Sequence, residues 1–401
     1  MKKVGYLMTD AISQQPREPQ AEPALKKVEL GFVGVGWIGR SRLQALADSG
    51  LTEIAAVTDP DRASIEACRK IAPNARVVGS LRELLAQDLD GVVIATPSAL
   101  HAEQSIEALN SGFAVFCQKP LGRNAGEVKR VVEAARRADR LLGVDLSYRW
   151  TRAASTLREV VQSGRIGRVF NVDLVFHNAY GPDKPWFYDL RLAGGGCVID
   201  LGVHLVDLAL WVLGFPEIVK TSSRLYNQGV LLRRNSAAVE DFATAQLLTA
   251  ENATVAVQCS WNLHAGCDAV IAARFYGERG AVVFENVNGS FYDFFSRLHN
   301  GTKSVSLAEP PDAWSGRAAV EWARKLQSGP RFNGEAKEHI AVAQILDSIY
   351  GRDDRHGGIH NVEIDEFFDK FEDASLAFVY EDETSEGEKS NFNKLVRRDE
   401  Q

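Results

Sequence analysis

A glycine-rich segment near the start of the sequence restricts the fold more than any other feature. Gly34-Val35-Gly36-Trp37-Ile38-Gly39 is a G-x-G-x-x-G pattern that follows the apolar run 28–33 and precedes a helical pattern at 41–49. Asp59 ends the next apolar run, 20 residues after Gly39. Glycines at this spacing allow a tight turn, a close approach of the backbone to a pyrophosphate, and close packing of helix on strand. The segment therefore predicts the first strand–turn–helix unit of a dinucleotide-binding domain.

The same segment indicates which cofactor the domain binds. The free N–H groups and the partial positive charge at a helix N-terminus suit the phosphates of a dinucleotide. Asp59 can accept hydrogen bonds from ribose hydroxyls and would repel a 2′-phosphate, so NAD is expected. Arg62 lies close by in the sequence and leaves NADP open. The residues predicted to bind the cofactor here are Gly34, Gly36, Trp37, Ile38, Gly39 and Asp59.

Apolar strand patterns alternate with helical patterns as far as about residue 145. Runs such as 91–95 and 113–116 are apolar throughout, which is typical of parallel strands covered on both faces. We therefore expect an α/β fold whose N-terminal part, residues 26–150, is a Rossmann domain with a doubly wound parallel sheet. Residues 1–25 are polar with three prolines and predict an extended N-terminal arm.

The pattern changes after residue 150, where strand candidates follow one another without helices between them. In 168–177, the side chains of Phe170, Val172, Leu174 and Phe176 are expected to share one buried face. A second α/β domain with a large, mostly antiparallel sheet is therefore expected over 151–380, followed by a polar tail at 381–401. Further strands are expected at 217–226, 239–250, 253–262 and 268–275, hairpin turns at 277–280 and 300–301, and helices at 316–327 and 335–350 that pack around this domain or return to the first.

Composition excludes several classes of partner. The 401 residues carry a net charge of -7, which argues against nucleic acid and anionic membranes as partners. No apolar run approaches the roughly 20 residues that span a bilayer, and the N-terminal segment lacks the apolar core of a signal peptide. The five cysteines are scattered without a C-x-x-C pair, which indicates reduced thiols in a cytoplasm, with no metal site expected.

Three further segments give the chain a family resemblance. They are 95–101, which contains Thr96-Pro97 and His101; Gln118-Lys119-Pro120; and 194–204, which begins with three glycines and contains Asp200 and His204. With the glycine-rich loop, their order and spacing resemble the glucose-fructose oxidoreductase/inositol dehydrogenase (Gfo/Idh/MocA) family over about residues 28–380. The resemblance implies an NAD(P)-dependent oxidoreductase acting on sugars or cyclitols, with a large open-faced second sheet that often joins subunits, so a homo-oligomer, dimer or tetramer, is expected.

The resemblance also implies roles for individual residues. Lys119 matches the family's active-site lysine, and Asp200 and His204 match its acid–histidine pair. Thr96, Pro97 and His101 match its second cofactor-contacting loop, and Gln118 stands beside the lysine. The segment Tyr148-Arg149-Trp150 resembles the one that enters the second domain past the nicotinamide, so Tyr148 and Arg149 are predicted to contact substrate.

The chemistry of these side chains agrees with the resemblance. Oxidising a secondary alcohol needs a hydride acceptor, a base for the hydroxyl proton and a cation near the developing alkoxide. Asp200 and His204 are four apart and share a face of a helix, and His204 is expected to titrate near neutrality as the base. Asp200 can orient His204 or bind a substrate hydroxyl, and Lys119 can hydrogen-bond the reacting oxygen. Taken singly, a lysine before a proline is also an ordinary turn residue, and an acid–histidine pair an ordinary helix-surface pair.

Two features concern specificity. The family typically has Glu-Lys-Pro where this chain has Gln118-Lys119-Pro120, and losing that negative charge is expected to lower the pKa of Lys119. The segment 179–189 places Trp186 and Tyr188 beside charged residues, a composition that suits the faces and hydroxyls of a sugar ring. The alternative is that these aromatic side chains cover the interface between the domains.

Two other functions stay open for such a chain. One is a glycoside hydrolase that uses NAD for transient oxidation followed by elimination, which needs an additional base that the sequence does not reveal. The other is a regulator that binds the cofactor without turnover, for which the loss of Lys119, Asp200 or His204 would be expected; all three are present.

Overall fold

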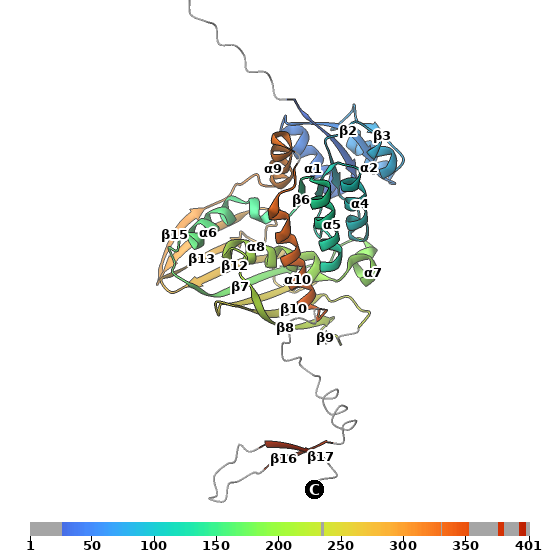
Figure 1. Ribbon diagram of the computed structural model, residues 1–401. Helices are drawn as coiled ribbons and strands as arrows, with labels where there is room; N and C mark the ends of the chain where they lie inside the picture. The colour runs from blue at the N-terminus through green and yellow to red at the C-terminus, as the bar shows by residue number, and fades with distance from the viewer. Residues whose placement is uncertain (1–25, 234–235, 330, 353–375, 381–392, 398–401) are drawn as a thin grey trace, which may run out of the picture.

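The computed structural model describes residues 26–233, 236–329, 331–352, 376–380 and 393–397. Most of these residues form two lobes, each built around one β-sheet (Figure 1). The predicted arm, 1–25, lies outside the described residues, as does most of the predicted tail. The last two described segments, β16 (Leu376–Tyr380) and β17 (Asn393–Arg397), form an antiparallel pair, so a strand occurs where the sequence predicted only a polar tail.

The first lobe is the expected doubly wound parallel sheet. Its strand order is β3-β2-β1-β4-β5-β6, in which the direction of winding reverses between β1 and β4. Every residue of β4 and β5 is buried, as continuous apolar runs predict. Its strands are β1 (Val28–Val33), β2 (Thr52–Thr58), β3 (Arg76–Val77), β4 (Gly91–Ile94), β5 (Ala114–Cys117) and β6 (Leu142–Val144), and its connecting helices are α1 (Trp37–Asp48), α2 (Arg62–Arg69), α3 (Leu81–Leu85), α4 (Ser98–Asn110) and α5 (Ala125–Ala138).

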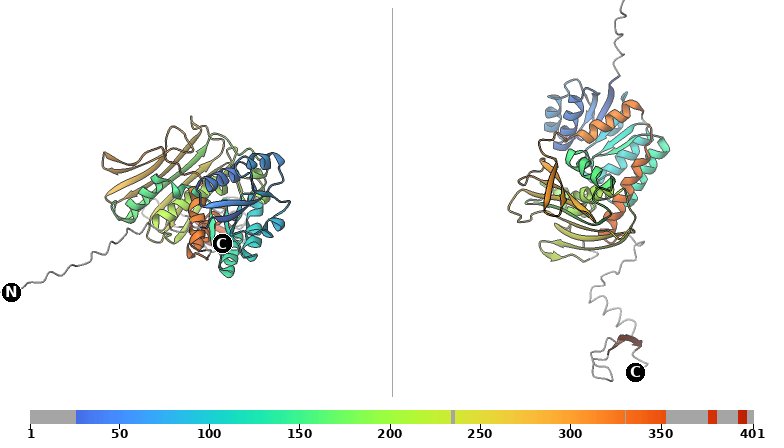
Figure 2. Two further views of the ribbon diagram at one scale, coloured as in Figure 1. Left: turned by 90° about the horizontal axis from the view of Figure 1, so that it is seen from above. Right: turned by 90° about the vertical axis from the view of Figure 1, so that its left-hand side faces the viewer.

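A helix from far along the chain completes the core of this lobe. α9 (Arg317–Ser328) lies against the N-terminal lobe in both Figure 1 and Figure 2, and its Trp322 packs in the same core as Phe32 and Phe116. A Cβ at Gly91 or Gly143 would come within 2.8 Å or 2.7 Å of the Trp322 ring, so these glycines let the indole lie on the sheet. α9 therefore belongs to the first core, although its residues fall in the range 151–380 predicted for the second domain.

The second lobe contains a nine-stranded sheet with the order β15-β14-β13-β12-β7-β11-β10-β8-β9. The β7–β11 pair is parallel and the other pairs are antiparallel, which confirms the expected mostly antiparallel sheet. Both expected hairpin turns occur, at 278–279 and 301–302. The strands are β7 (Val169–Asn178), β8 (Ile218–Asn227), β9 (Val230–Leu231), β10 (Phe242–Thr249), β11 (Thr254–Ser260), β12 (Ala269–Gly277), β13 (Gly280–Asn286), β14 (Phe294–Asn300) and β15 (Lys303–Ala308).

Helices cover one face of this sheet. On β7 the side chains of Val172, Leu174 and Phe176 are buried in the core with residues of α6 (Arg152–Gln162) and α8 (Val203–Leu213). Phe170, which was expected on the same face, is 47% exposed near the start of the strand. The last long helix, α10 (Glu338–Ile349), packs against both α5 and α8 and so touches both lobes.

The segment Leu190–Leu213, which includes α8, contains an apolar 18-residue window with a mean hydropathy of 1.8. By length and composition it could cross a membrane, but 78% of its most apolar window is buried inside the protein. That degree of burial is what a core helix shows, and α8 packs between the second sheet and α10.

Candidate active site

The predicted cofactor-binding loops and Lys119 lie where the parallel strands of the first sheet end. Successive loops are tied together by backbone hydrogen bonds: Ala95 N donates to Val33 O (2.8 Å), Gln118 N to Ile94 O and Asp145 N to Cys117 O (both 2.9 Å). These bonds extend the sheet by one residue beyond β4, β5 and β6 and fix the side chains that follow. The carboxyl edge of such a sheet, at the reversal of strand order, is where ligands of doubly wound folds bind.

The glycine-rich loop has the geometry that its sequence predicted. Gly34 has φ +87°, and a Cβ there would lie 2.5 Å from Ala95 O. A Cβ at Gly39 would lie 2.2 Å from Gly34 O, so this glycine allows the helix to approach the strand. At Gly36 a Cβ would meet nothing within 4 Å, so the space beside its backbone is open to a ligand.

The start of α1 and Asp59 complete this loop. Gly36 provides no side-chain cap for α1, and Arg40 N donates to Gly36 O (2.9 Å), which leaves the N–H groups of the preceding turn for a phosphate. Trp37 is 71% exposed at this turn. Asp59 accepts hydrogen bonds from Val35 N (2.7 Å) and Asp61 N (2.8 Å), so it braces the loop. The residues present therefore fit a dinucleotide.

Replacing Gly34 by alanine is expected to weaken NADH binding about tenfold or more, because the added Cβ forces the loop away from Ala95. Gly50→Ala is the matched control: Gly50 also has a positive φ (+71°), but a Cβ there meets nothing within 4 Å. Both variants should lose about 1–2 kcal/mol of stability from backbone strain. Fluorescence titration with NADH distinguishes them, and equal affinities would contradict the assignment of the loop.

His101 connects the second and third loops. It is buried, with Nε2 2.6 Å from Thr96 O and Nδ1 2.7 Å from Pro120 O. The hydroxyl of Thr96 donates to Gln104 (2.7 Å), and Pro97 precedes the first residue of α4. His101 therefore holds the loops after β4 and β5 together, so its ring supports the predicted cofactor-contacting loop from beneath.

Lys119 and Asp200 meet across the two lobes. Lys119 Nζ donates to Asp200 Oδ1 and to Asp200 O, both at 2.6 Å. The other carboxylate oxygen, Oδ2, accepts from Trp261 Nε1 at 3.1 Å. The two charged side chains are partly exposed, 20% and 17%, so they face the site rather than the core. The peptide bond before Pro120 is cis.

The turn that carries Asp200 is a five-residue π-helical segment, Val198–Gly202, that continues into α8. Its start is held by the buried carboxylate of Glu240, which accepts from Gly196 N (2.9 Å) and Val198 N (3.0 Å). A Cβ at Gly196 would lie 1.9 Å from Glu240 O, and one at Gly195 would lie 2.0 Å from the Tyr350 hydroxyl oxygen. The run of glycines therefore allows this turn to sit tightly against β10 and α10. π-Helical turns of this kind occur frequently at functional sites.

His204 differs from the expectation in two respects. Its Nδ1 is buried without a hydrogen-bond partner among the described residues, while Asp200 uses its oxygens for Lys119 and Trp261. Burial lowers the pKa of His204 well below its usual range, and the charges of Lys119 and Arg42 lower it further. The prediction that His204 titrates near neutrality is therefore wrong for this environment, where the imidazole is neutral.

Gln118 forms part of a buried polar cluster. Its Nε2 donates to Asp145 Oδ2 (2.5 Å), and Arg42 Nε donates to the same oxygen (2.5 Å). The side chains of Arg42 and Asp145 are 6% and 0% exposed. The negative charge that the sequence suggested was lost at residue 118 is thus present on Asp145, beside the Gln118 amide.

The predicted substrate loop lies next to this centre. Trp186 and Tyr188 belong to the short 3-10 helix Pro185–Tyr188. The Tyr188 ring contacts Trp261 edge-on at 5.6 Å, and its hydroxyl donates to Pro182 O. Trp186 stacks on Phe187 at 3.8 Å. Tyr148 contacts the His204 ring edge-on at 4.9 Å, so it lies against the site from the second core.

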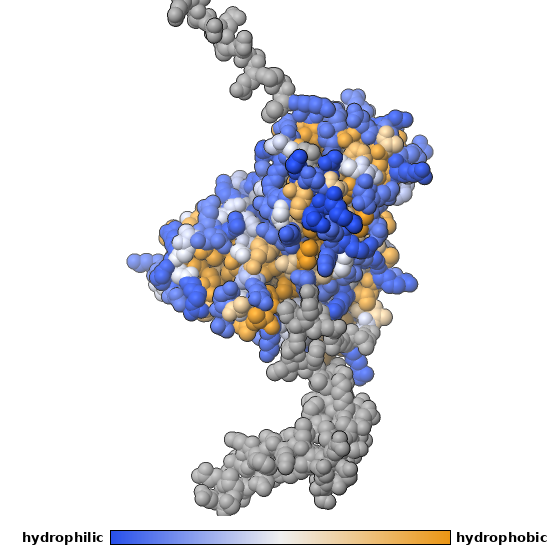
Figure 3. Space-filling model, viewed as in Figure 1, coloured by the Kyte–Doolittle hydropathy of each residue, from blue (hydrophilic) through white to orange (hydrophobic). Residues whose placement is uncertain are grey.

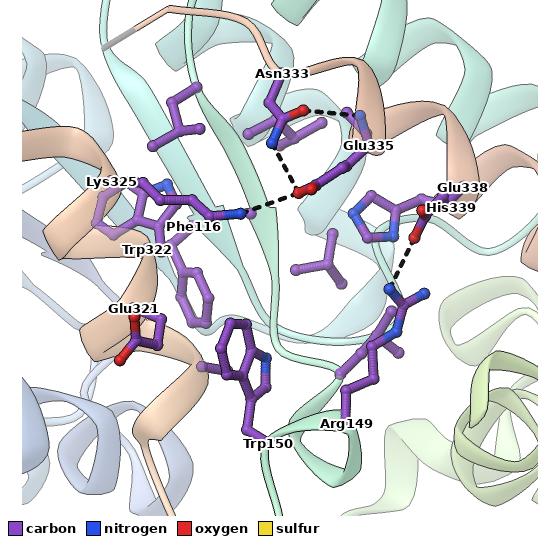
Figure 4. A pocket seen from close by; sticks show the side chains of 17 residues that line it. Phe116, Arg149, Trp150, Glu321, Trp322, Lys325, Asn333, Glu335, Glu338 and His339 are labelled. Atoms are coloured by element: carbon purple, nitrogen blue, oxygen red, sulfur yellow. Dashed lines mark hydrogen bonds and ion pairs between the residues drawn. The ribbon is translucent and has the colours of Figure 1, made fainter. Parts of the chain in front are cut away.

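Arg149 has a different role from the predicted substrate contact. Its guanidinium binds Asp207 through Nε (2.8 Å) and Nη2 (2.5 Å), and Glu338 through Nη1 (2.7 Å). Figure 4 shows Arg149 and Glu338 at the edge of a cavity of about 100 Å³ between β6, α9 and α10, with Trp322 on the opposite side. The guanidinium is therefore committed to ion pairs that join the entry into the second lobe to α8 and α10.

Comparison with known proteins identifies the family. A model described as "Oxidoreductase family, NAD-binding Rossmann fold" matches residues 28–146, and one described as "GFO/IDH/MocA C-terminal domain" matches 154–283. Inositol 2-dehydrogenase 3 of Saccharopolyspora erythraea is 30% identical over 327 residues, covering 73% of this chain and 90% of its own length. The chain belongs to the GFO/IDH/MocA family. It is thus an oxidoreductase with an NAD-binding Rossmann domain, as the sequence predicted.

Other GFO/IDH/MocA relatives extend the comparison. D-apiose dehydrogenase of Paraburkholderia graminis is 28% identical over 343 residues, covering 81% of this chain and 88% of its own. The crystal structure of GenD2 from gentamicin A biosynthesis in complex with NAD matches with a TM-score of 0.69 at 24% identity, covering 83% and 96% of the two chains. KijD10, a 3-ketoreductase from Actinomadura kijaniata in complex with NADP, gives 0.70 at 20%, covering 81% and 98%. These structures confirm the two-lobed fold.

Sequence reasoning missed four residues that shape the site: Trp261, Arg42, Asp145 and Glu240. Asp145 directly follows the short strand β6, 27 residues from its partner Gln118. Trp261 stands at the end of a predicted strand, 61 residues from its partner Asp200, and nothing in the sequence links the two.

Proposed function

We propose that this GFO/IDH/MocA protein transfers a hydride between NAD and a secondary hydroxyl or keto group of a sugar, cyclitol or derivative. The observation that carries the proposal is the 2.6 Å contact between Lys119 Nζ and Asp200 Oδ1, which joins the cofactor-side loop after β5 to the π-helical turn of the second lobe. The sugar and cyclitol names of the relatives, an inositol dehydrogenase and an apiose dehydrogenase, support the substrate class.

The side chains divide the work of such a reaction. Bound NAD would supply the hydride acceptor. Lys119 is placed to hydrogen-bond the reacting oxygen and stabilise its developing negative charge. Asp200 holds Lys119 in position, and neutral His204 is available to accept a hydrogen bond. Trp186 and Tyr188 offer ring faces to the substrate, with Tyr148 behind His204.

Association and location are further proposals. On the face seen in Figure 3, hydrophobic residues gather over the second lobe in the region that Figure 1 labels α8, β12 and β7. A gathered apolar surface favours contact with another copy, and we propose a dimer or tetramer joined through the second lobe. Light scattering of the purified protein tests it, and a monomeric mass would contradict it. All five cysteines are free, which supports a cytoplasmic location.

The proposed function is tested by purifying the protein, measuring NAD(H) and NADP(H) binding, and screening sugars and cyclitols for NADH formation. Net NADH with a free sugar or cyclitol is the expected result. Cleavage of a glycoside without net NADH would replace the proposal by the hydrolase mechanism. Bound nicotinamide with no turnover across a broad panel would replace it by a regulatory role.

A further inference from the structure

We propose that Gln118 and Asp145 together recognise the carboxamide of the nicotinamide, with Arg42 fixing the orientation of both. The proposal rests on the proposed function for the position of the nicotinamide beside Lys119. It assigns to three residues, on α1 and after β5 and β6, a role in positioning the cofactor for reaction.

The first step concerns which way the Gln118 amide faces. Asp145 Oδ2 lies 2.5 Å from the Gln118 amide nitrogen, and a carboxylate only accepts hydrogen bonds. The amide N–H₂ must therefore point at Asp145, because the reverse orientation would set two oxygens against each other. This turns the carbonyl oxygen of Gln118 away from Asp145, where it can act as an acceptor for a ligand.

The second step concerns what holds Asp145. Arg42 Nε binds the same Oδ2 at 2.5 Å, and Arg42 is itself held by Ser315 Oγ (3.3 Å) and Ser147 Oγ (3.5 Å). Arg42 and Asp145 are almost fully buried, so neither can exchange its partner for water. Since Arg42 lies on α1, which begins at the glycine-rich loop, the cluster ties the phosphate end of the cofactor site to Gln118.

The third step is an unpaired atom. Asp145 Oδ1 is buried and has no hydrogen-bond partner within the described part of the chain. A buried acceptor without a donor is costly and is expected where a ligand provides the donor. The cluster thus offers two acceptors, the Gln118 carbonyl oxygen and Asp145 Oδ1, after neighbouring strands. A carboxamide N–H₂ carries two donors, which matches this pair.

The same reasoning explains why residue 118 is not a carboxylate here. A glutamate at 118 would set a second negative charge 2.5 Å from the Asp145 oxygen, with one arginine to balance both. Gln118→Met removes the amide carbonyl oxygen that would accept from the carboxamide and adds no second charge. Its preference for NADH over an analogue without the carboxamide N–H₂ should therefore be smaller than that of the parent.

The experiment measures binding of NADH and of its reduced 3-acetylpyridine analogue, in which a methyl group replaces the amide N–H₂. The parent should bind NADH at least about tenfold more tightly than the analogue, which lacks both N–H donors of the carboxamide. Gln118→Glu should lose about tenfold in NADH affinity, and Gln118→Met should prefer NADH over the analogue by no more than about threefold. Gln44→Glu is the matched control, because Gln44 also donates to a carboxylate (Asp48, 2.8 Å), but on the exposed face of α1.

Three results would overturn the proposal: equal binding of NADH and the analogue by the parent, the parent's full preference for NADH retained in Gln118→Met, or a fall in melting temperature with NADH affinity unchanged. The last would indicate a purely structural cluster. Because no substrate is needed, failure to find an oxidisable sugar leaves the result intact. Failure to bind either dinucleotide would overturn both this proposal and the proposed function.

Discussion

Replacing Lys119 by methionine is expected to lower turnover about 10²- to 10⁴-fold, the range supplied by a positioned proton-transfer group. Methionine keeps the length of the side chain but removes the charge that contacts Asp200 Oδ1 and would contact the reacting oxygen. NADH affinity should stay within about threefold, because the phosphate loop and Asp59 are untouched. Steady-state kinetics on a substrate found in the screen, with NADH titration alongside, checks both parts.

The control for this variant is Lys325→Met. Lys325 also forms an ion pair, with Glu335 at 2.9 Å, but its side chain is 49% exposed and lies on α9, away from Asp200. Its replacement should leave turnover unchanged. Unchanged turnover in the Lys119 variant, or equal losses in both, would contradict the assigned role of Lys119.

The largest effect on stability is expected at Arg149. Arg149→Met leaves the buried Asp207, whose side chain is 3% exposed, without its cation, and removing one partner of such a pair costs about 3–5 kcal/mol. Burial already raises the pKa of Asp207 although Arg149 opposes the shift, so this carboxylate depends on its partner. The midpoint of denaturant unfolding should fall accordingly.

Two further variants separate the buried pair from a general effect of losing an arginine. Arg168→Met removes an exposed partner of Glu278 and should cost no more than about 1 kcal/mol. Arg149→Met combined with Asp207→Leu removes both buried charges and should recover much of the lost stability. If Arg149→Met and Arg168→Met lose the same amount, the ion pair does not join the lobes as described.

The sequence predicted those parts of the site whose chemistry is local. The glycine-rich loop could be predicted because its glycines are required by local backbone geometry. Gly34 has a positive φ, and Gly39 lies too close to Gly34 O for a side chain. Most strands of both sheets were predictable from apolar runs and alternation, whereas β13, β14 and β15 were indicated only by the expected hairpin turns. Lys119 and Asp200 could be brought together by the family resemblance, although 81 residues separate them.

The remaining features depend on which long-range partner each polar side chain finds. Arg149 was expected at the substrate, but Asp207 and Glu338, 58 and 189 residues away, hold its guanidinium. Burial and the positive charges of Lys119 and Arg42 lower the pKa of His204. The four-residue spacing between Asp200 and His204 does not reveal these causes. Asp145, the partner of Gln118, follows β6, the strand next to β5 in the sheet. The periodicity of apolar residues predicts helices and strands but not a contact between two polar side chains of this kind.

The position of α9 determines when the core of the first lobe can be completed during synthesis of the chain. One face of the first sheet, around Phe32 and Phe116, is covered by Trp322 and its neighbours. Those residues leave the ribosome roughly 170 positions after β6, when most of the second lobe has already been made. A fragment ending at residue 150 would keep α1 on this face but would leave the part that Trp322 covers exposed, so we expect the nucleotide-binding lobe to complete its core late.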